Sequence, residues 1–392
     1  MSTAYSVSMP SPSSSAVGTR QRNLARVLRL VHEEGPVPRS ALTERTGLNR
    51  STTAALVGEL ADLGLVSEQL PDAAGRVGRP SPVVGASADV VALVANPEVD
   101  AVEIAAIGLD RSVRLRERVE LAGVPTPDEA VATIAERAAA WSSGALAGAR
   151  IVAAGLAVPG LVRAADGVVR NAPHLGWRDV GLADLASEAL GVPAVADNDA
   201  TCGIVAEHRF GAARGRDHVV YLNGGASGIG GGLIVHGVPV GGASGFAGEF
   251  GQSRDGGASL ETRVRRQRLL DAAGLAGGDD AALRDALARA AAESDDGVAD
   301  ELAAQRSALA GALANAVDIL NPGLIVLGGF LAIVNELGEG ALAAEVAAAA
   351  MPESAEGLAI AQAALGADRL LIGAAEAAFA SLLDDPAAGG GA

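Results

Sequence analysis

The sequence predicts an α/β protein in two parts, an N-terminal winged helix-turn-helix followed by a two-lobed body. Two observations predict this arrangement. Before residue 64, apolar residues recur at helical spacing in three short segments, and a hairpin-like stretch follows them. From residue 89 onward, strand-like apolar runs alternate with helices in two successive blocks, which is the pattern of two α/β lobes.

The first part is expected to contain helices over residues 20–34, 40–46 and 50–63. Leu24, Val27, Leu28 and Val31 lie on one face of the first helix, and Gly35 with Pro36 ends it. Gly47 ends the second, and Asn49 can cap the third. Residues 65–85 indicate a β-hairpin with an Arg/Gly/Pro tip, which completes a winged helix.

Charge separates the two parts. The chain has 30 basic and 47 acidic residues and a net charge of -17, which excludes binding to nucleic acid or anionic membranes by bulk charge. Residues 20–80 nevertheless contain nine arginines and seven acidic residues. A slightly basic segment on an acidic body is typical of a DNA-reading head.

The third helix is the predicted reading element. Its start, "NRSTT", is expected to enter the major groove, and the wing "GRVGRP" is suited to the minor groove or its phosphates. The candidate DNA contacts are Asn49, Arg50, Ser51, Thr52, Arg76 and Arg79. The alternative is a winged helix used for protein contacts, with the arginines as a solvated surface.

Composition also bounds the compartment and the chemistry. Cys202 is the only cysteine, which excludes a disulfide framework and a multi-cysteine zinc site. The sequence has no apolar run of about 18 residues and no apolar signal segment at its start, so we expect a cytoplasmic protein without membrane contact.

The pattern also gives domain boundaries. Two α/β lobes side by side suit an actin-like, sugar-kinase-like fold, in which ligands bind in the cleft between the lobes. The expected segments are a disordered tail at 1–19, the winged helix at 20–85, a first lobe at 86–200 completed by a C-terminal helix at 366–384, a second lobe at 201–365 and a disordered tail at 385–392.

Four stretches of the body can carry chemistry, and each can also be explained by a purely structural role. "VADNDAT" places Asn198 and Asp199 at a helix start, where they are either a sugar-binding pair or a simple cap. "GGASGIGGG" is either a phosphate cradle or a glycine hairpin. "GFAGEFGQ" presents Glu249 in a loop, where it is either a ligand contact or simply solvated. "PHLGW" places His174 and Trp177 at a cleft or merely at its edge.

The order and spacing of these motifs are more specific than any one of them. The winged helix followed by "AGLAVPGLV", "NAPHLGW", "VADNDAT", "GIGGGL", "GFAGEFGQ" and "LNPGLIVLGG" resembles the ROK family of repressors, open reading frames and kinases along nearly the whole chain. The resemblance implies that Asp199 is the ancestral catalytic base. It also implies that Asn198 and Glu249 contact sugar.

The chain departs from the family pattern after Glu249. Gln252 stands where the family has a zinc-binding histidine, the cysteine segment is missing, and Glu261 matches the last sugar-contacting glutamate by position. Glutamine is a poor zinc ligand, so we expect neither a metal nor a cofactor. Gln252 can still exchange hydrogen bonds with a sugar, and Glu261 is a candidate contact.

A second departure concerns ATP. The family's kinases carry a "DxGGT" phosphate loop, and "NPEVD" at residues 96–100 stands in its place. Pro97 removes an N–H donor, while Glu98 and Asp100 are expected to repel a triphosphate by a few kcal/mol, at an effective dielectric near 20. ATP binding and phosphoryl transfer are therefore expected to be lost, which leaves Asp199 without its ancestral catalytic role.

These observations predict a transcriptional regulator of carbohydrate genes, most simply a repressor, and not an enzyme. Its expected partners are operator DNA and a sugar effector held by Asn198, Asp199, Glu249, Gln252 and Glu261, and we expect a homodimer or homotetramer. Two alternatives stay open: an active ROK sugar kinase with an added DNA-binding domain, and a regulator whose sugar site is vestigial.

Overall fold

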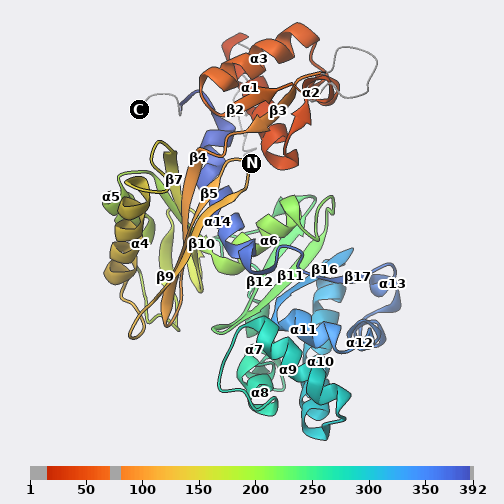
Figure 1. The fold of residues 1–392 in the computed structure, drawn as a ribbon. Helices are drawn as coiled ribbons and strands as arrows, with labels where there is room; N and C mark the ends of the chain where they lie inside the picture. Colours follow the sequence, from red (N-terminus) through yellow and green to blue (C-terminus); the bar gives the residue numbers. More distant parts are fainter. Residues whose placement is uncertain (1–15, 71–80, 389–392) are drawn as a thin grey trace, which may run out of the picture. The chain divides into compact units, whose positions relative to one another are not determined.

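The computed structural model describes residues 16–70 and 81–388 (Figure 1). The chain divides into two compact units. The smaller unit comprises the residues up to Val90, Gly108–Ser112 and the residues from Phe379 onward. The larger comprises Val91–Ile107 and Val113–Ala378.

The smaller unit is the predicted winged helix. Its sheet has the strand order β1-β3-β2, and both pairings are antiparallel. The hairpin tip that carries Arg76 and Arg79 lies outside the described residues. Its elements are α1 (Ala16–Glu34), β1 (Val37–Pro38), α2 (Arg39–Thr46), α3 (Arg50–Asp62), β2 (Val66–Gln69) and β3 (Val83–Ala86). Helix α1 therefore begins at Ala16, four residues before the expected helix start at residue 20.

The core of the smaller unit also uses distant segments. Leu24 and Val31 of α1 are fully buried, as the helical spacing predicts. His32 is 1% exposed, and its Nδ1 lies 2.6 Å from the carbonyl oxygen of Leu109. Its ring meets the ring of Phe379 edge-on at 5.9 Å. The turn at 108–112 and the end of the chain thus complete the winged-helix core.

The first lobe of the larger unit is a five-stranded sheet of order β10-β7-β4-β5-β6. Helices α4 and α5 lie on one side of this sheet (Figure 1), and α4 starts with a capping box between Thr126 and Glu129. The elements are β4 (Val90–Pro97), β5 (Ala101–Gly108), β6 (Val113–Glu120), α4 (Pro127–Ser142), β7 (Arg150–Val158), β8 (Leu161–Arg163), β9 (Val168–Asn171), α5 (Leu182–Leu190) and β10 (Ala194–Asn198).

The second lobe has a sheet of order β13-β12-β11-β16-β17. Its strands are β11 (Val219–Gly225), β12 (Gly228–Val235), β13 (Val238–Pro239), β14 (Arg254–Asp255), β15 (Ala258–Ser259), β16 (Leu324–Gly329) and β17 (Ala359–Gln362). Its helices are α6 (Asp199–Phe210), the 3-10 helix η1 (Phe250–Gln252), α7 (Leu260–Arg263), α8 (Arg266–Ala272), α9 (Asp280–Ala292), α10 (Asp296–Leu320), α11 (Phe330–Glu336), α12 (Ala341–Ala349) and α13 (Pro352–Ala355).

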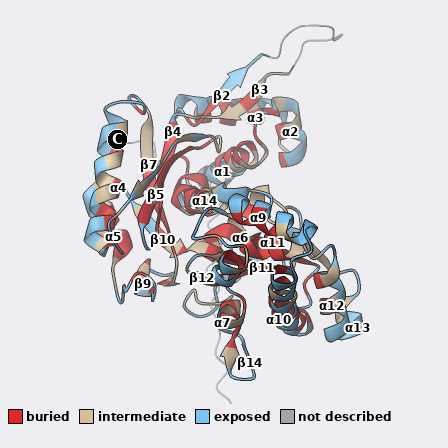
Figure 2. Ribbon diagram, turned by 60° about the horizontal axis from the view of Figure 1, so that its bottom comes forward, coloured by how far each residue is buried: buried red, intermediate tan, exposed pale blue. Residues whose placement is uncertain are grey.

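The two sheets share one topology. If the strands of each main sheet are numbered along the chain from one to five, both follow the order 3-2-1-4-5. This repeat is the predicted two-lobed, actin-like architecture. Figure 2 shows β4, β5 and β11 buried, whereas α4 and α5 are buried only on the side facing their sheet. Each sheet thus positions the loops at its strand ends from a rigid apolar core.

The chain ends with η2 (Gly366–Asp368) and α14 (Arg369–Asp384). The first lobe was expected to be completed by a helix at 366–384, and α14 does approach β7, since a Cβ on Gly155 would overlap the backbone of Ala374. The residues from Phe379 onward belong instead to the smaller unit. Among the described residues, no helix is long and apolar enough to cross a membrane.

Candidate functional site

The first candidate site is the start of α3. Asn49 caps this helix, and its Oδ1 accepts hydrogen bonds from the Thr52 backbone N–H at 2.8 Å and the Ser51 hydroxyl at 2.7 Å. The cap fixes where the helix begins and leaves Asn49, Arg50 and Ser51 exposed in the first turn. A helix start with exposed polar side chains has the chemistry of a groove-reading element.

Several arginines of the head form ion pairs with carboxylates of the same unit. Arg20 pairs with Glu59 at 2.5 Å, Arg39 with Glu68 at 3.1 Å, and Arg45 with Glu34. The sequence count of nine arginines therefore overstates the unpaired positive charge of the head, although these three side chains stay 33% to 54% exposed. Arg50 is exposed, and it is the strongest described candidate for a DNA contact.

The second candidate site begins where β10 passes into α6. Strand β10 runs parallel to β7, so Asn198 and Asp199 lie at the carboxyl end of a parallel pair, the edge where α/β sheets bind ligands. Asn198 caps α6 by accepting from the Thr201 N–H at 3.0 Å, and its Nδ2 donates to the Gly160 carbonyl at 2.9 Å. The amide keeps one further donor and one further acceptor position for a ligand.

Asp199 is the first residue of α6 and is only partly exposed. Burial raises its pKa to about 6, and the negative charge of Glu249 acts in the same direction. The Ala200 N–H, which donates to Oδ1 at 2.8 Å, and the charge of Arg369 act against this rise. Asp199 is therefore a carboxylate that gains or loses its proton near neutral pH.

The loop that follows β13 brings three predicted residues together. Burial raises the pKa of Glu249, and the charge of Glu261 raises it further. Gln252 donates from Nε2 to Glu261 Oε1 at 2.7 Å. This hydrogen bond and the 2.9 Å bond from the Leu260 N–H to the Ser253 carbonyl close the shortened loop.

The glycines of β12 allow α6 and the loop around Glu249 to pack closely against this strand. A Cβ on Gly230 would lie 2.8 Å from Ala200 Cβ, and one on Gly231 would lie 2.5 Å from Phe250 Cδ2 and 2.6 Å from the Gly248 carbonyl. Gly248 has φ +100°, which a residue with a side chain rarely adopts. Strand β12 is paired with β11 from Gly228 to Ile234. This packing favours the glycine-hairpin alternative for "GGASGIGGG" over the phosphate cradle.

The turn between β4 and β5 differs from the expected electrostatics. Glu98 and Asp100 both pair with Arg118, the latter at 2.8 Å, and Arg118 also contacts Glu120 at 2.8 Å. The two carboxylates that were expected to repel a triphosphate are therefore partly neutralised. Burial still raises the pKa of Glu98, against the pull of Arg118. Pro97 has no N–H, and the Glu98 N–H is bonded to the Ala101 carbonyl at 2.8 Å, so these two backbone positions do not cradle a phosphate.

Comparison with known proteins gives sequence relatives for part of the chain. The ROK family model matches residues 99–255. This segment of the chain is therefore similar to the ROK-family domain, called the ROK domain below. The xylose repressor of Bacillus spizizenii is 29% identical over 234 residues, which are 58% of this chain and 59% of that protein. The glucokinase of Streptomyces coelicolor is 35% identical over 131 residues, which are 33% of this chain and 41% of that protein. The chain thus matches less than two thirds of either relative.

A solved structure extends the comparison to the whole fold. A ROK family transcriptional regulator, a homolog of the E. coli MLC protein, superposes with a TM-score of 0.75 at 23% identity, covering 93% of this chain and 97% of its own. This likeness establishes the fold of the winged helix together with the ROK domain. It includes the head, which the family model does not cover.

Within the larger unit, the sequence analysis did not predict a polar cluster around Arg369. Arg369 donates from Nη2 to Asn223 Oδ1 at 2.6 Å and from Nε to the Tyr221 hydroxyl at 3.2 Å. Next to it, Asp368 pairs with Arg116 of β6. The adjacent residues Asp368 and Arg369 thus contact β6 of the first lobe and β11 of the second. The sequence signal for this cluster is the pair of polar residues, Tyr221 and Asn223, in the apolar stretch "HVVYLNGG". No catalytic motif marks this strand.

Two further residues of the ROK domain have plain structural surroundings. Trp177 is 3% exposed and donates from Nε1 to the Pro125 carbonyl at 2.8 Å, so it packs in the first lobe. His174 is exposed. Across residues 16–70 and 81–388, no group of three or more His, Cys, Asp or Glu side chains has the arrangement of a metal site.

Proposed function

We propose that this protein is a DNA-binding transcriptional regulator, a repressor of carbohydrate genes, whose ROK domain binds a sugar and transfers no phosphate. One observation carries the proposal. A single chain joins a winged helix with an exposed, capped α3 to a ROK domain in which Asp199, Glu249 and the Gln252–Glu261 pair are gathered.

The proposed DNA contacts are Asn49, Arg50, Ser51 and Thr52 of α3, with Arg76 and Arg79 of the wing. Winged helices read paired half-sites, and one head with little free positive charge binds DNA weakly, so the proposed form is a homodimer or homotetramer. A bidentate contact from an arginine such as Arg50 to a guanine is worth about 1–3 kcal/mol of discrimination.

The proposed effector is a neutral sugar. The carboxylates of Asp199 and Glu249 accept hydrogen bonds from sugar hydroxyls, Gln252 offers a donor and an acceptor, and Asn198 keeps free positions. Three carboxyl groups in one site repel the phosphate of a sugar phosphate. The xylose repressors among the relatives support D-xylose as the first sugar to test.

The test of the DNA contacts is a gel-shift titration. The duplex is one that the wild-type chain enriches from a random-sequence library. We expect Arg50→Ala together with Arg79→Ala to weaken binding at least 10-fold, because each removed contact is worth about 1 kcal/mol or more. Arg268→Ala, which removes one exposed charge from α8 of the ROK domain, is the matched control and should bind as wild type. Equal binding by the double variant contradicts the assigned interface.

A rival function is an active sugar kinase with an added DNA-binding domain. The likeness to glucokinases and the retained Asp199 favour it. The β4–β5 turn argues against it, since Pro97 and the bonded Glu98 N–H remove two phosphate donors. A coupled ATPase assay with glucose, xylose and N-acetylhexosamines decides between them, because turnover with any of these sugars overturns the non-catalytic proposal.

A third possibility is a regulator whose sugar site is vestigial. In that case, none of these sugars should change the thermal stability of the protein.

A further inference from the structure

Helix α14 is built tightly against the helix that carries Asp199. Gly373 of α14 faces the backbone of Cys202 in α6, so closely that a Cβ at this glycine would overlap the Cys202 carbonyl. One turn further, Glu376 pairs with Arg209 of α6 at 2.7 Å, and the Glu376 side chain is only 2% exposed. Asp199 begins α6, and Arg209 lies at its end. The two contacts therefore hold α6 and α14 together as one packed pair.

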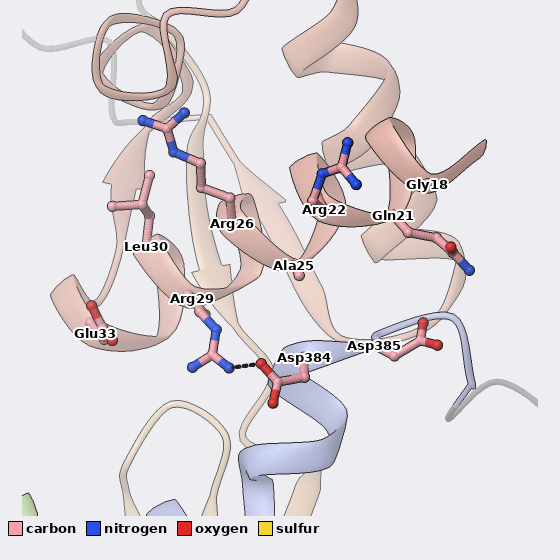
Figure 3. Close-up of a pocket in the computed structure, with 10 residues that line it drawn as sticks. All are labelled: Gly18, Gln21, Arg22, Ala25, Arg26, Arg29, Leu30, Glu33, Asp384 and Asp385. Atoms are coloured by element: carbon pink, nitrogen blue, oxygen red, sulfur yellow. Dashed lines mark hydrogen bonds and ion pairs between the residues drawn. The ribbon is translucent and has the colours of Figure 1, made fainter. Parts of the chain in front are cut away.

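The same helix ends in the core of the smaller unit. Arg369–Ala378 belong to the larger unit, and Phe379–Asp384 belong to the smaller one. Phe379 and Leu383 are fully buried, and Phe379 stacks edge-on against His32 of α1. Asp384 pairs with Arg29 of α1 (Figure 3). Helix α1 packs against α3, which carries the proposed DNA contacts.

We infer that α14 is the element that couples the proposed sugar site to the DNA-binding head, and that the ion pair between the buried Glu376 and the partly exposed Arg209 fixes its contact with α6. This inference rests on the proposed function and names its regulatory path. A sugar bound at Asp199 changes the position of α6, and the packed α6–α14 pair moves together. Sixteen residues of α-helix span about 24 Å, and α14 contains no proline that would absorb the movement as a kink.

The choice of an ion pair has a physical reason. A helix–helix contact made only by small apolar side chains can slide by fractions of a turn at low cost. The Glu376 carboxylate, only 2% exposed, instead holds one geometry, because it is strongly disfavoured in the interior without its arginine partner. Glu376 is accordingly a positioning residue: it acts on the sugar site through α6 and on the head through α14.

The inference is tested with Glu376→Gln in the full chain, using D-xylose and the library-selected duplex. Wild-type couplings of this kind change affinity about 5- to 150-fold. We expect Glu376→Gln to reduce the effect of saturating xylose on DNA affinity to less than 2-fold, while the Kd for xylose and the Kd for DNA alone change less than about 3-fold. Arg209→Gln breaks the same pair from its partly exposed side and should behave alike if Glu376→Gln does not fold. Glu345→Gln, which breaks the 2.6 Å pair with Arg306 between α10 and α12, is the control and should retain the xylose effect.

Amide hydrogen exchange tests the same path without a sugar. Exchange in residues 24–34 of α1 should accelerate in Glu376→Gln and not in Glu345→Gln. Unchanged exchange in α1, or a full xylose effect in a folded Glu376→Gln protein, overturns the coupling role of α14. If wild-type DNA binding ignores xylose but α1 exchange still responds to Glu376→Gln, the coupling stands and the proposed effector is wrong.

Discussion

Asp199 owes its properties to its immediate neighbours. It lies at the start of α6, where the helix dipole favours a negative charge, yet burial raises its pKa to about 6. In a kinase, such a carboxyl group is suited to take a proton from a sugar hydroxyl. In the proposed regulator, the same group accepts a hydrogen bond from that hydroxyl, and the strength of the contact depends on its protonation.

Sugar binding is therefore predicted to depend on pH. A carboxylate accepts from a hydroxyl better than a protonated carboxyl group does, so the affinity for D-xylose should fall as the pH falls through about 6, by up to about 10-fold per unit. The raised pKa of Glu249 acts in the same direction. Calorimetric titrations between pH 7.5 and 5 measure this change, and Asp199→Asn should bind weakly with a shallower profile. An affinity that is constant or rises as the pH falls contradicts this role for Asp199.

For single residues, the sequence singled out candidates but did not give their pairings. The motifs singled out Asp199, Glu249, Gln252 and Glu261, and the structure places Gln252 against Glu261. The neutralisation of Glu98 and Asp100 by Arg118 was not foreseen, because it depends on the register of β5 with β6. The assigned roles in sugar and DNA binding stay predictions.

Among the elements, β12 sets how closely α6 and the loop around Glu249 can approach. Its glycines face Ala200 on one neighbour and Phe250 on the other, with no room for a side chain. The strand thus contributes to the site by its lack of side chains. The sequence alone left the run open between a phosphate cradle and a hairpin, since both need glycine.

Replacing one of these glycines should destabilise the fold. Gly231→Ala would place a Cβ 2.5 Å from Phe250 Cδ2 and 2.6 Å from the Gly248 carbonyl, and overpacking of this kind costs about 1–3 kcal/mol. Gly225→Ala in the same hairpin meets nothing closer than 3.9 Å and should change the free energy of unfolding by less than about 0.5 kcal/mol. Urea denaturation of the two variants measures both values. Equal stabilities would show that the loop around Glu249 does not pack as described.

Periodicity predicted most elements because their burial is regular. The helices at 16–34, 39–46 and 50–62 and the strands of the first lobe follow their apolar patterns closely. The start of α1 was missed, since "AVGT" carries no helical signal of its own. The sequence also did not show that α14 belongs to both compact units, because the apolar pattern of a helix does not indicate which core it packs into.

For the whole molecule, the sequence predicted a winged helix followed by two lobes, and the shared 3-2-1-4-5 strand order confirms the repeat. The composition of the two compact units could not be predicted. The smaller unit recruits Gly108–Ser112 and the end of the chain, and these contacts bring together residues that are far apart in the sequence. In the proposed regulator, sugar binding in the ROK domain changes the DNA affinity of the head, and the reverse effect has the same size.

The most direct test of the central claim is the affinity of the full chain for its library-selected duplex, measured by fluorescence anisotropy with and without saturating sugar. D-xylose, D-glucose and N-acetylhexosamines are tested in turn. The proposed function predicts that one of these sugars lowers the DNA affinity at least 5-fold, and that Asp199→Ala abolishes this effect while binding DNA normally. The proposal is contradicted if the DNA affinity is the same with and without every sugar. It is also contradicted if a sugar effect is present without ATP and lost when ATP is added.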